Sequence, residues 1–329
     1  MKALVYTAEK TLEYKDFADP APKDDEVLIQ IESVGICGSD MHAFLGHDER
    51  RPAPLILGHE AAGTIMSGPQ KGQRVTINPL VSCGECEFCL EGRTNLCVNR
   101  QIISMPPREG GFAQMISMPT HNLVNVPDHV PLEKAALAEP LGCGWHAVQL
   151  AKENAHKPIE DCKAMAIGGG AIGLGAALCL KAAGCKDITL VEPNEMRRNF
   201  VIEKTGLNAT TPEDIKGESI FDVIIDGVGI NATRKSSSAQ IKPGGTIVHI
   251  GLGDARDGLD IRRMTLQEIT FIGSYTYTHQ DFIDTAHAIF DGRLGDLSWT
   301  EQRPLSDGQK AFEDILSGQV AAPKIVLKP

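Results

Sequence analysis

The segment AMAIGGGAIGLGAALCLKAAG, residues 164–184, decides the predicted fold. Its apolar start has the length of a buried strand, and its Ala- and Leu-rich end is typical of a helix. Between them, Gly168, Gly170 and Gly173 stand in G-x-G-x-x-G register. In a strand–turn–helix unit the first glycine permits a tight turn, the second lets the backbone approach a pyrophosphate, and the third allows close helix packing. We therefore predict a dinucleotide site at the start of this helix.

The next apolar run, ITLVE, predicts which dinucleotide binds. It ends at Glu192, where a carboxylate can accept hydrogen bonds from the ribose hydroxyls of NAD and repel the 2′-phosphate of NADP. Arg197 and Arg198 follow closely, so NADP stays open as the alternative, and Arg197 is itself an expected cofactor contact. Ala171 and Ile172, at the start of the helix, complete the predicted NAD site. The competing interpretation is a glycine-rich turn that only opens a buried helix.

Apolar runs occur in two different rhythms along the chain. Up to about residue 140, short alternating runs broken by Pro and Gly are typical of an antiparallel barrel or sandwich. From residue 164, five runs of strand length alternate with helical segments expected at 171–183, 194–205 and 232–241. This alternation predicts a doubly wound parallel sheet, the Rossmann fold.

A chain of 329 residues is long enough for two domains. We expect a barrel-like first domain over residues 1–141, a Rossmann domain over residues 142–275, and a C-terminal segment over residues 276–329 that packs back onto the first domain. This last segment contains two amphipathic helical candidates, DFIDTAHAIFDG and DGQKAFEDILSG, and a closing strand, KIVLK, with SWTEQRPL as a connection.

The net charge of −11 opposes association with nucleic acid and with anionic lipid. No continuous apolar stretch has the length of a membrane span, and the N-terminus lacks the pattern of a secretory signal. We therefore expect a cytoplasmic protein without nucleic-acid or membrane partners.

Four of the nine cysteines are clustered in the pattern Cys83-x2-Cys86-x2-Cys89-x7-Cys97. In a cytoplasmic chain, clustered cysteines favour a metal site over disulfides, and four thiolates suit a closed tetrahedral zinc site. The alternative is an iron–sulfur cluster, whose bacterial pattern has three residues before the last Cys and Pro after it. Here seven residues intervene and Val98 follows, so we predict a structural zinc loop over residues 83–97.

Three other segments contain residues that can bind a metal: GICGSDMHAF with Cys37, LGHEAAG with His59, and ALAEPLGCGWHAV with Glu139. Each is weak by itself, because a lone Cys or His is usually a core or surface residue and a Glu before Pro commonly ends a loop. Taken together with the nucleotide motif and the cysteine loop, they resemble the zinc-containing medium-chain alcohol dehydrogenases over essentially the whole chain. The resemblance implies a GroES-like β-barrel catalytic domain joined to the Rossmann domain.

The resemblance assigns Cys37 and His59 as two ligands of a catalytic zinc. Where alcohol dehydrogenases supply a second cysteine, this chain has Glu139 in an E-P-L segment, which resembles the sorbitol and threonine dehydrogenase branch. In that branch either the glutamate of the G-H-E motif, here Glu60, or the E-P-L glutamate lies at the metal. Both Glu60 and Glu139 are therefore expected metal residues.

Further roles are implied by the same resemblance. Asp40 matches the acid that orients the ligating histidine, Ser39 the hydroxyl that takes the substrate's proton, and His42 the residue that passes protons to solvent. Ala43 stands where sorbitol dehydrogenases often carry Tyr, and GSYTYTHQDF, residues 273–282, lacks their Arg. These departures argue against sorbitol dehydrogenase itself. The resemblance of the cysteine, histidine and glutamate pattern still implies a polyol or sugar-derived secondary alcohol, with a sugar acid, a simple secondary alcohol or a hydroxy amino acid as alternatives.

The expected activity is hydride transfer from an alcohol to NAD, with one catalytic and one structural zinc ion. Alternatives are a threonine or hydroxy-acid dehydrogenase of the same family, a zinc-bearing NAD-binding protein without catalysis, and a zinc-free reductase, which the metal motifs argue against. The apolar run from GTIVHIGL to FIGSY is an expected interface of a homodimer or homotetramer. Phe44 and Phe112 are candidate walls of the substrate pocket.

Overall fold

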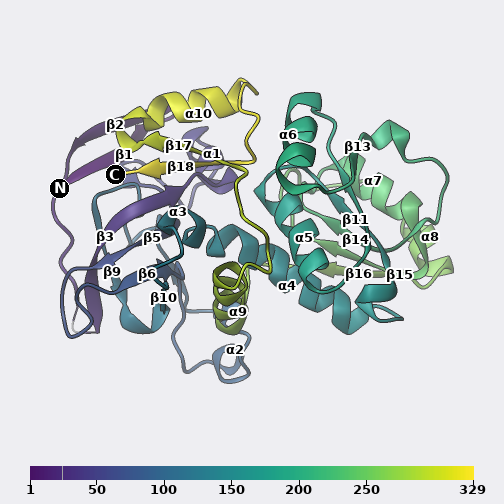
Figure 1. Cartoon of the computed structure of the whole chain (residues 1–329), viewed down its shortest axis with the longest axis horizontal. Coiled ribbons are helices and arrows are strands. Elements are labelled where there is room, and N and C mark those ends of the chain that lie inside the picture. The colour runs from purple at the N-terminus through teal and green to yellow at the C-terminus, as the bar shows by residue number, and fades with distance from the viewer. Residues whose placement is uncertain (24) are drawn as a thin grey trace.

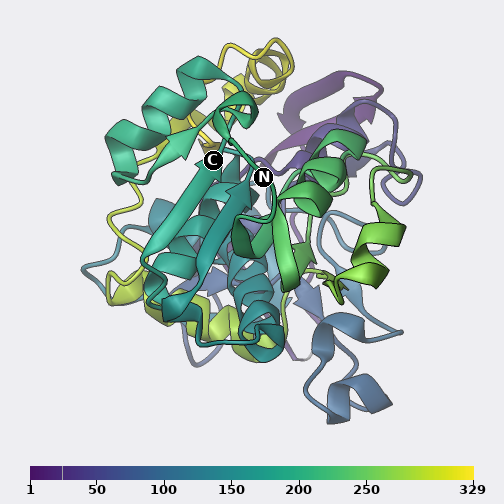
Figure 2. The same cartoon turned by 90° about the vertical axis from the view of Figure 1, so that its right-hand side faces the viewer.

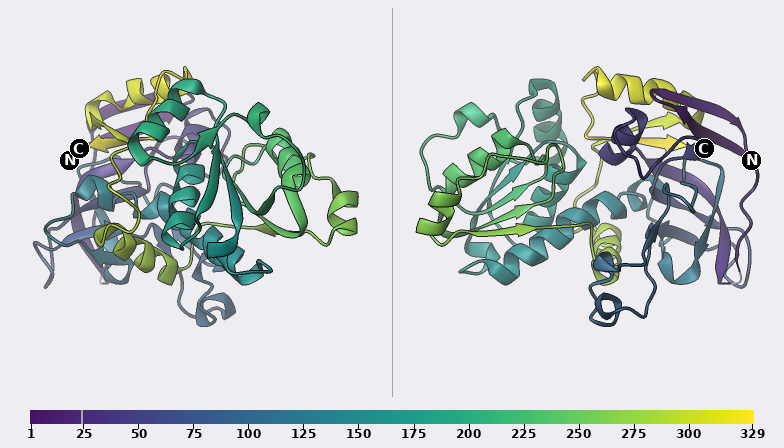
Figure 3. Two further views of the ribbon diagram at one scale, coloured as in Figure 1. Left: turned by 45° about the vertical axis from the view of Figure 1, so that its right-hand side comes forward. Right: turned by 180° about the vertical axis from the view of Figure 1, so that it is seen from behind.

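The computed structural model describes residues 1–23 and 25–329. Two lobes stand side by side and are connected by α4 (Ala138–Asn154), which runs from one lobe into the other (Figures 1 and 3). The expected domain boundary at residues 141 and 142 falls inside this helix. Within the described residues, no helix is both long and apolar enough to cross a membrane.

The N-terminal lobe is built from antiparallel strands, because its sequence alternates apolar and polar residues and is broken by Pro and Gly. A three-stranded sheet has the order β2-β1-β4, and a larger sheet has the order β10-β6-β5-β3-β18-β17 with β9 also paired to β3. The bounds of its own strands and helices are β1 (Lys2–Ala8), β2 (Thr11–Asp16), β3 (Glu26–Gly35), α1 (Gly38–Phe44), β4 (Leu55–Ile56), β5 (Glu60–Ile65), β6 (Arg74–Ile77), β9 (Met115–Pro119), β10 (Leu123–Asn125) and α3 (Leu132–Ala135).

The C-terminal segment completes this larger sheet. Strand β18 (Lys324–Lys328) pairs antiparallel with β3 and parallel with β17 (Thr300–Pro304). The predicted helices appear as α9 (His279–Phe290) and α10 (Gly308–Leu316). Strand β17 lies in the stretch expected to be only a connection. None of its five residues, TEQRP, is fully buried and they do not alternate apolar with polar, so the pairing with β18 defines it as a strand.

The second lobe confirms the predicted doubly wound parallel sheet. Its strand order is β13-β12-β11-β14-β15-β16, and every pairing is parallel. The three predicted helices are present, each within a residue or so of its expected bounds. The elements are β11 (Lys163–Ile167), α5 (Ala171–Ala182), β12 (Asp187–Val191), α6 (Glu195–Thr205), β13 (Ala209–Thr210), β14 (Phe221–Asp226), α7 (Asn231–Gln240), β15 (Ile241–His249), α8 (Ile261–Leu266) and β16 (Thr270–Gly273).

Small residues let the linking helix α4 pack closely on α5. A Cβ atom on Gly144 would meet the backbone nitrogen of Ala176 at 2.7 Å, so the two helix backbones almost touch at this crossing. Leu141 and Leu174 are fully buried in the same apolar cluster. Because this cluster extends from α4 to the parallel sheet, the helix is anchored in the second lobe.

The four-cysteine loop projects from the N-terminal lobe and is visible at the lower right of Figure 2. This excursion contains α2 (Glu87–Leu90) and a short 3₁₀ helix, η1 (Thr94–Leu96). Strands β7 (Leu80–Val81) and β8 (Gln101–Ile102) pair at its base. Its location beside α9 is seen in Figures 1 and 3.

Candidate functional site

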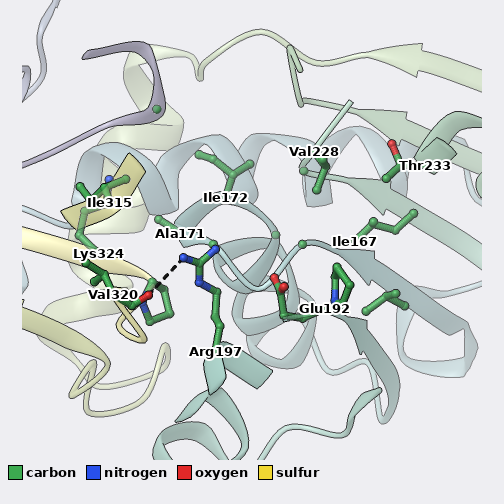
Figure 4. A pocket seen from close by; sticks show the side chains of 18 of the residues that line it. Ile167, Ala171, Ile172, Glu192, Arg197, Val228, Thr233, Ile315, Val320 and Lys324 are labelled. Atoms are coloured by element: carbon green, nitrogen blue, oxygen red, sulfur yellow. Dashed lines mark hydrogen bonds between the residues drawn. The ribbon is translucent and has the colours of Figure 1, made fainter. Parts of the chain in front are cut away.

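A cavity of about 600 Å³ lies where the two lobes meet. Its walls come from the ends of β11, β12 and β14, from the start of α5, from α1, and from the C-terminal segment before β18 (Figure 4). All seven residues predicted to bind the dinucleotide line this cavity: Gly168, Gly170, Ala171, Ile172, Gly173, Glu192 and Arg197.

The geometry of the glycine-rich turn explains why glycine is needed. Gly168 has φ +101°, a conformation that residues with side chains rarely adopt. A Cβ atom on Gly173 would lie 2.1 Å from the carbonyl oxygen of Gly168, so α5 can approach the turn only without a side chain there. Gly170 has no atom within 4 Å of its missing Cβ and leaves the N-terminus of α5 open to the cavity. These are the features that a pyrophosphate site requires.

Glu192 directly follows β12, and its side chain points toward the glycine-rich turn. Its carboxylate accepts hydrogen bonds from the backbone N–H groups of Gly169 at 2.7 Å and Asn194 at 2.8 Å. Arg197 lies on the opposite side of the opening and donates a hydrogen bond to the carbonyl oxygen of Val320 (Figure 4). An acidic residue and a basic residue therefore both border the region expected for the adenosine ribose.

The cavity also has walls that the sequence analysis did not identify. Val228 lines it after β14, and Thr233 lines it from α7 and donates a hydrogen bond to Asp226 at 2.7 Å. Lys324, at the start of β18, lines it from the other lobe. The Gly-Val-Gly stretch after a buried strand was a detectable signal for Val228, whereas only the pairing of β18 brings Lys324 here.

Cys37, His59 and Glu60 form a cluster in which one potential ligand atom of each residue lies within 4.8 Å of the others. Cys37 immediately precedes α1, and the other two residues stand at the start of β5. Cys37 also lines the cavity at the glycine-rich turn, so the cluster borders the predicted dinucleotide site. A thiolate, an imidazole and a carboxylate are ligands that zinc accepts.

Asp40 holds this cluster in place from α1. Its carboxylate accepts the backbone N–H of Cys37 at 3.0 Å and of Gly58 at 3.1 Å, and Oδ1 lies 3.5 Å from Nδ1 of His59. Burial alone would raise the pKa of Asp40, but the neighbouring His59 lowers it below its usual value. Because the hydroxyl of Ser104 is also 3.4 Å from Nδ1, both contacts leave Nε2 of His59 for a metal.

Glu60 supplies a buried carboxylate of which one oxygen is paired and one is free. Oε1 accepts a hydrogen bond from the ammonium group of Lys324 at 2.5 Å, and Oε2 has no partner among the described residues. A Cβ atom on Gly35 would lie 2.0 Å from Oε2, so the glycine makes space for this side chain. An unpaired buried oxygen next to a thiol and an imidazole fits a zinc ligand, because a cation would satisfy it.

Glu139 lies on the first turn of α4 and is not part of the three-residue cluster. Its Oε1 accepts a hydrogen bond from the hydroxyl of Tyr277 at 2.8 Å. Burial raises the pKa of Glu139, and the nearby Glu60 raises it further while His59 lowers it. The pKa of Glu139 therefore responds to two members of the cluster, although Glu139 is not one of them.

Ser39 and His42 lie on α1 directly after Cys37. Ser39 is half-buried on the first turn, and His42 is exposed one turn later. Residues three apart are neighbours on a helix surface, so the pair extends from the cluster toward solvent. The two predicted pocket walls, Phe44 and Phe112, lie elsewhere: both are fully buried and pack against Phe312 in the core of the N-terminal lobe.

The four cysteines of the projecting loop converge on one point. Neighbouring sulfur atoms are 3.5 Å apart for Cys86 and Cys89, 3.5 Å for Cys97 and Cys83, and 3.9 Å for Cys83 and Cys89. A tetrahedral zinc ion with Zn–S bonds of about 2.3 Å requires S–S separations of about 3.8 Å. Backbone N–H groups of Glu85 and Cys86 lower the pKa of Cys83 to about 6, which favours a thiolate. The loop fits a closed structural zinc site.

Comparison with known proteins matches both halves of the chain to described families. A family described as "Alcohol dehydrogenase GroES-like domain" matches residues 23–128, and one described as "Zinc-binding dehydrogenase" matches residues 171–291.

Individual relatives extend over the full chain. The L-galactonate-5-dehydrogenase of Escherichia coli K12 is 31% identical over 97% of this chain and 96% of its own. The sorbitol dehydrogenase of Bacillus subtilis 168 is 30% identical over 100% of this chain and 97% of its own. Among solved structures, a zinc-binding dehydrogenase of Sinorhizobium meliloti 1021 bound to NADP is 26% identical, with a TM-score of 0.87 over 100% of this chain and 99% of the other.

Proposed function

The chain belongs to the family of zinc-binding alcohol dehydrogenases, and on that premise we propose that it oxidises a secondary alcohol of a polyhydroxylated substrate with NAD as hydride acceptor. The observation that carries this proposal is the cluster of Cys37, His59 and Glu60 at the edge of the dinucleotide cavity. This arrangement supports hydride transfer, because these three residues would hold a metal that supplies a Lewis acid, beside the cavity that would hold a nicotinamide cofactor.

We propose Cys37, His59 and Glu60 as the protein ligands of the catalytic zinc, and the four cysteines of the projecting loop as the ligands of a structural zinc. The free Oε2 of Glu60 supports its choice over Glu139 as the third ligand. When bound, zinc supplies a Lewis acid for the substrate oxygen and the nicotinamide supplies a hydride acceptor.

The residues of this chain orient the reactants and move protons. The carboxylate of Asp40 accepts a hydrogen bond from the backbone N–H of Cys37, which fixes the position of Cys37, and it orients the imidazole of His59. Ser39 is proposed to accept the hydroxyl proton of the substrate, and His42, exposed one turn later on α1, to exchange it with solvent. Glu139, held by Tyr277, keeps a carboxyl group beside the reacting carbon.

Glu192 supports NAD as the preferred cofactor. A carboxylate after β12 can bind the ribose hydroxyls of NAD and repels a 2′-phosphate. The names of the relatives support a polyhydroxylated substrate, since one acts on galactonate and another on sorbitol. A polyol and a sugar acid both present a secondary alcohol that the same metal can bind.

The test is a screen of NAD reduction over polyols, sugar acids and simple secondary alcohols, with and without a zinc chelator. We expect turnover with at least one polyhydroxylated compound, loss of activity with the chelator, and recovery when zinc is restored. Turnover that withstands complete zinc removal would overturn the proposed chemistry, and binding of NAD and two zinc ions without turnover on any alcohol would favour a non-catalytic protein.

We also propose that two copies associate through the exposed edge of the parallel sheet. Strand β16 is the last strand of that sheet, and the adjacent Leu252, Ile261 and Leu266 are 80%, 62% and 70% exposed. Isolated apolar side chains are common on surfaces, but three beside an open edge favour self-association. Leu252→Glu together with Leu266→Glu should lower the mass measured by light scattering to that of one chain.

The location that we propose is a reducing compartment such as the cytoplasm. It agrees with nine cysteines that are free of disulfide bonds.

A further inference from the structure

We propose that Thr94 and Asn95, which belong to the four-cysteine loop, are positioning residues for Glu139 and act through the segment of residues 275–279. This inference rests on the proposed function, because it takes Glu139 to lie beside the reacting groups. It connects the structural metal loop to the catalytic centre by a continuous series of contacts.

The first contacts join the loop to the segment. The side-chain amide of Asn95 donates a hydrogen bond to the carbonyl oxygen of Tyr275 at 2.9 Å, and the hydroxyl of Thr94 accepts the backbone N–H of His279 at 2.7 Å. The guanidinium group of Arg100 also lies over the Tyr275 ring at 5.1 Å. The loop therefore holds the segment at both ends, where it passes from β16 to α9.

The next contact joins the segment to the catalytic residue. Tyr277, in the middle of the segment, is 1% exposed and donates its hydroxyl to Glu139 at 2.8 Å. Its ring has little freedom, because it packs against Phe282 and lies where a Cβ atom on Gly142 would meet it at 2.8 Å. Since the ring cannot reorient independently, the position of its hydroxyl follows the position of the segment backbone.

The segment itself has a conformation that needs external support. Thr276 has φ +48°, in the left-handed region that a β-branched residue rarely occupies. It lies between the two positions that Thr94 and Asn95 hold. A strained backbone persists only when its surroundings determine it, so the contacts from the loop keep Tyr277 directed toward Glu139.

This mechanism predicts that the loop affects catalysis without contacting the reactants. Asn95→Ala removes the donor to Tyr275, and Thr94→Val removes the acceptor for His279 with almost no change in volume. Asn99→Ala, at an exposed position of the same excursion, is the matched control. We expect Asn95→Ala and Thr94→Val each to lower kcat by about 10- to 100-fold, because small misplacements near the reacting atoms cost that much. The KM for NAD and the zinc content should stay unchanged.

A double-mutant cycle with Tyr277→Phe tests the route. If the loop acts through Tyr277, Asn95→Ala should cost almost nothing in kcat once the tyrosine hydroxyl is gone. Cobalt in place of the catalytic zinc supplies a readout that needs no substrate: its visible spectrum should shift in Asn95→Ala and Tyr277→Phe but not in Asn99→Ala.

Three results would overturn the inference: fully additive losses in the cycle, an unchanged kcat and cobalt spectrum in both loop variants, or losses that accompany release of zinc from the loop. Failure of the proposed function looks different. In that case the wild-type protein has no chelator-sensitive turnover with any alcohol, and the cobalt spectrum still reports whether the loop and Glu139 are connected.

Discussion

The ammonium group of Lys324 donates a hydrogen bond to Oε1 of Glu60 at 2.5 Å, and both side chains are buried. The lysine also donates to the carbonyl oxygen of Ile36 at 2.8 Å, directly before Cys37. Burial alone would lower the pKa of Lys324, but the neighbouring Glu60 raises it above its usual value. Strand β18, from the C-terminal segment, therefore brings an ammonium group to the cluster of Cys37, His59 and Glu60.

Lys324→Met should destabilise the metal-free protein more than the zinc-loaded protein. Without the lysine, Glu60 is a buried carboxylate without a partner, and breaking a buried pair in this way costs about 3–5 kcal/mol. A bound zinc ion supplies positive charge to the same carboxylate, so we expect a smaller loss with zinc. Urea unfolding of both metal states at neutral pH measures the difference.

Lys328→Met is the matched control on the same strand. Lys328 is partly exposed and donates to the hydroxyl of Ser33, so its loss should cost less than about 1 kcal/mol in either metal state. Equal destabilisation of Lys324→Met with and without zinc would mean that Glu60 does not face the metal.

Asp222 should stabilise the parallel sheet above mildly acidic pH and lose this effect in acid. Its carboxylate, at the start of β14, accepts hydrogen bonds from the backbone N–H of Lys163 at 2.8 Å and from Lys242 at 3.0 Å, and pairs with Lys157 at 3.0 Å. Burial raises its pKa, but these partners together lower it below the usual value. A lowered folded-state pKa means that the stabilisation is complete above the unfolded pKa of about 3.9 and disappears as the pH falls through the folded pKa.

Asp222→Asn removes this contribution at neutral pH. At neutral pH we expect the free energy of unfolding to fall by about 1–3 kcal/mol, because hydrogen bonds to a charged group are lost. The difference in this free energy from wild type should become smaller as the pH falls below about 4. Unfolding in urea at several pH values, followed by circular dichroism, measures both effects. Asp187→Asn, at an exposed position of β12, should change little, and a pH-independent loss in Asp222→Asn would argue against an ionic cause.

The parts of the candidate site that the structure brings together as the sequence predicted depend on local patterns. The turn at Gly168 and Gly173 needs glycine for reasons set within one strand and one helix, and the cysteine loop closes within 15 residues. In such cases neighbouring residues determine the geometry, so spacing alone is informative. The helices and strands of the second lobe were predictable for the same reason.

The remaining features depend on contacts between distant parts of the chain. Lys324 reaches Glu60 across 264 positions, and Tyr277 reaches Glu139 across 138. No local pattern distinguishes Lys324 from other lysines before a strand, and β17 gains its structure from its partner. Phe44 and Phe112 were expected as walls of the substrate pocket, but they pack with Phe312 from α10 instead.

Gly173→Ala should weaken cofactor binding by moving α5 away from the turn. The new Cβ atom would meet two carbonyl oxygens, those of Gly168 at 2.1 Å and Ile167 at 2.5 Å, and backbone atoms cannot rotate away. We expect a loss of about 1–3 kcal/mol in stability and a Kd for NADH at least about 10-fold higher, measured by fluorescence titration. In Gly175→Ala, on the same helix, the new Cβ atom comes closest to the end of the Leu141 side chain at 3.1 Å and meets backbone atoms only at an ordinary 3.8 Å, so this variant should bind NADH almost normally.

Glu192→Gln should reduce the preference for NAD over NADP. The substitution keeps the size of the side chain and removes the charge that repels a 2′-phosphate, while Arg197 stays at the opening to attract it. Loss of one charged hydrogen bond to the ribose is worth about 1.5–3 kcal/mol, so kcat/KM for NAD should fall by about 10- to 100-fold while the value for NADP stays constant or rises.

The control for a general change of charge is Glu195→Gln, at an exposed position on the first turn of α6. Because Glu192 also accepts the backbone N–H groups of Gly169 and Asn194, the melting temperature must be measured in parallel. Equal losses with both cofactors would show that Glu192 supports the turn rather than selecting the cofactor.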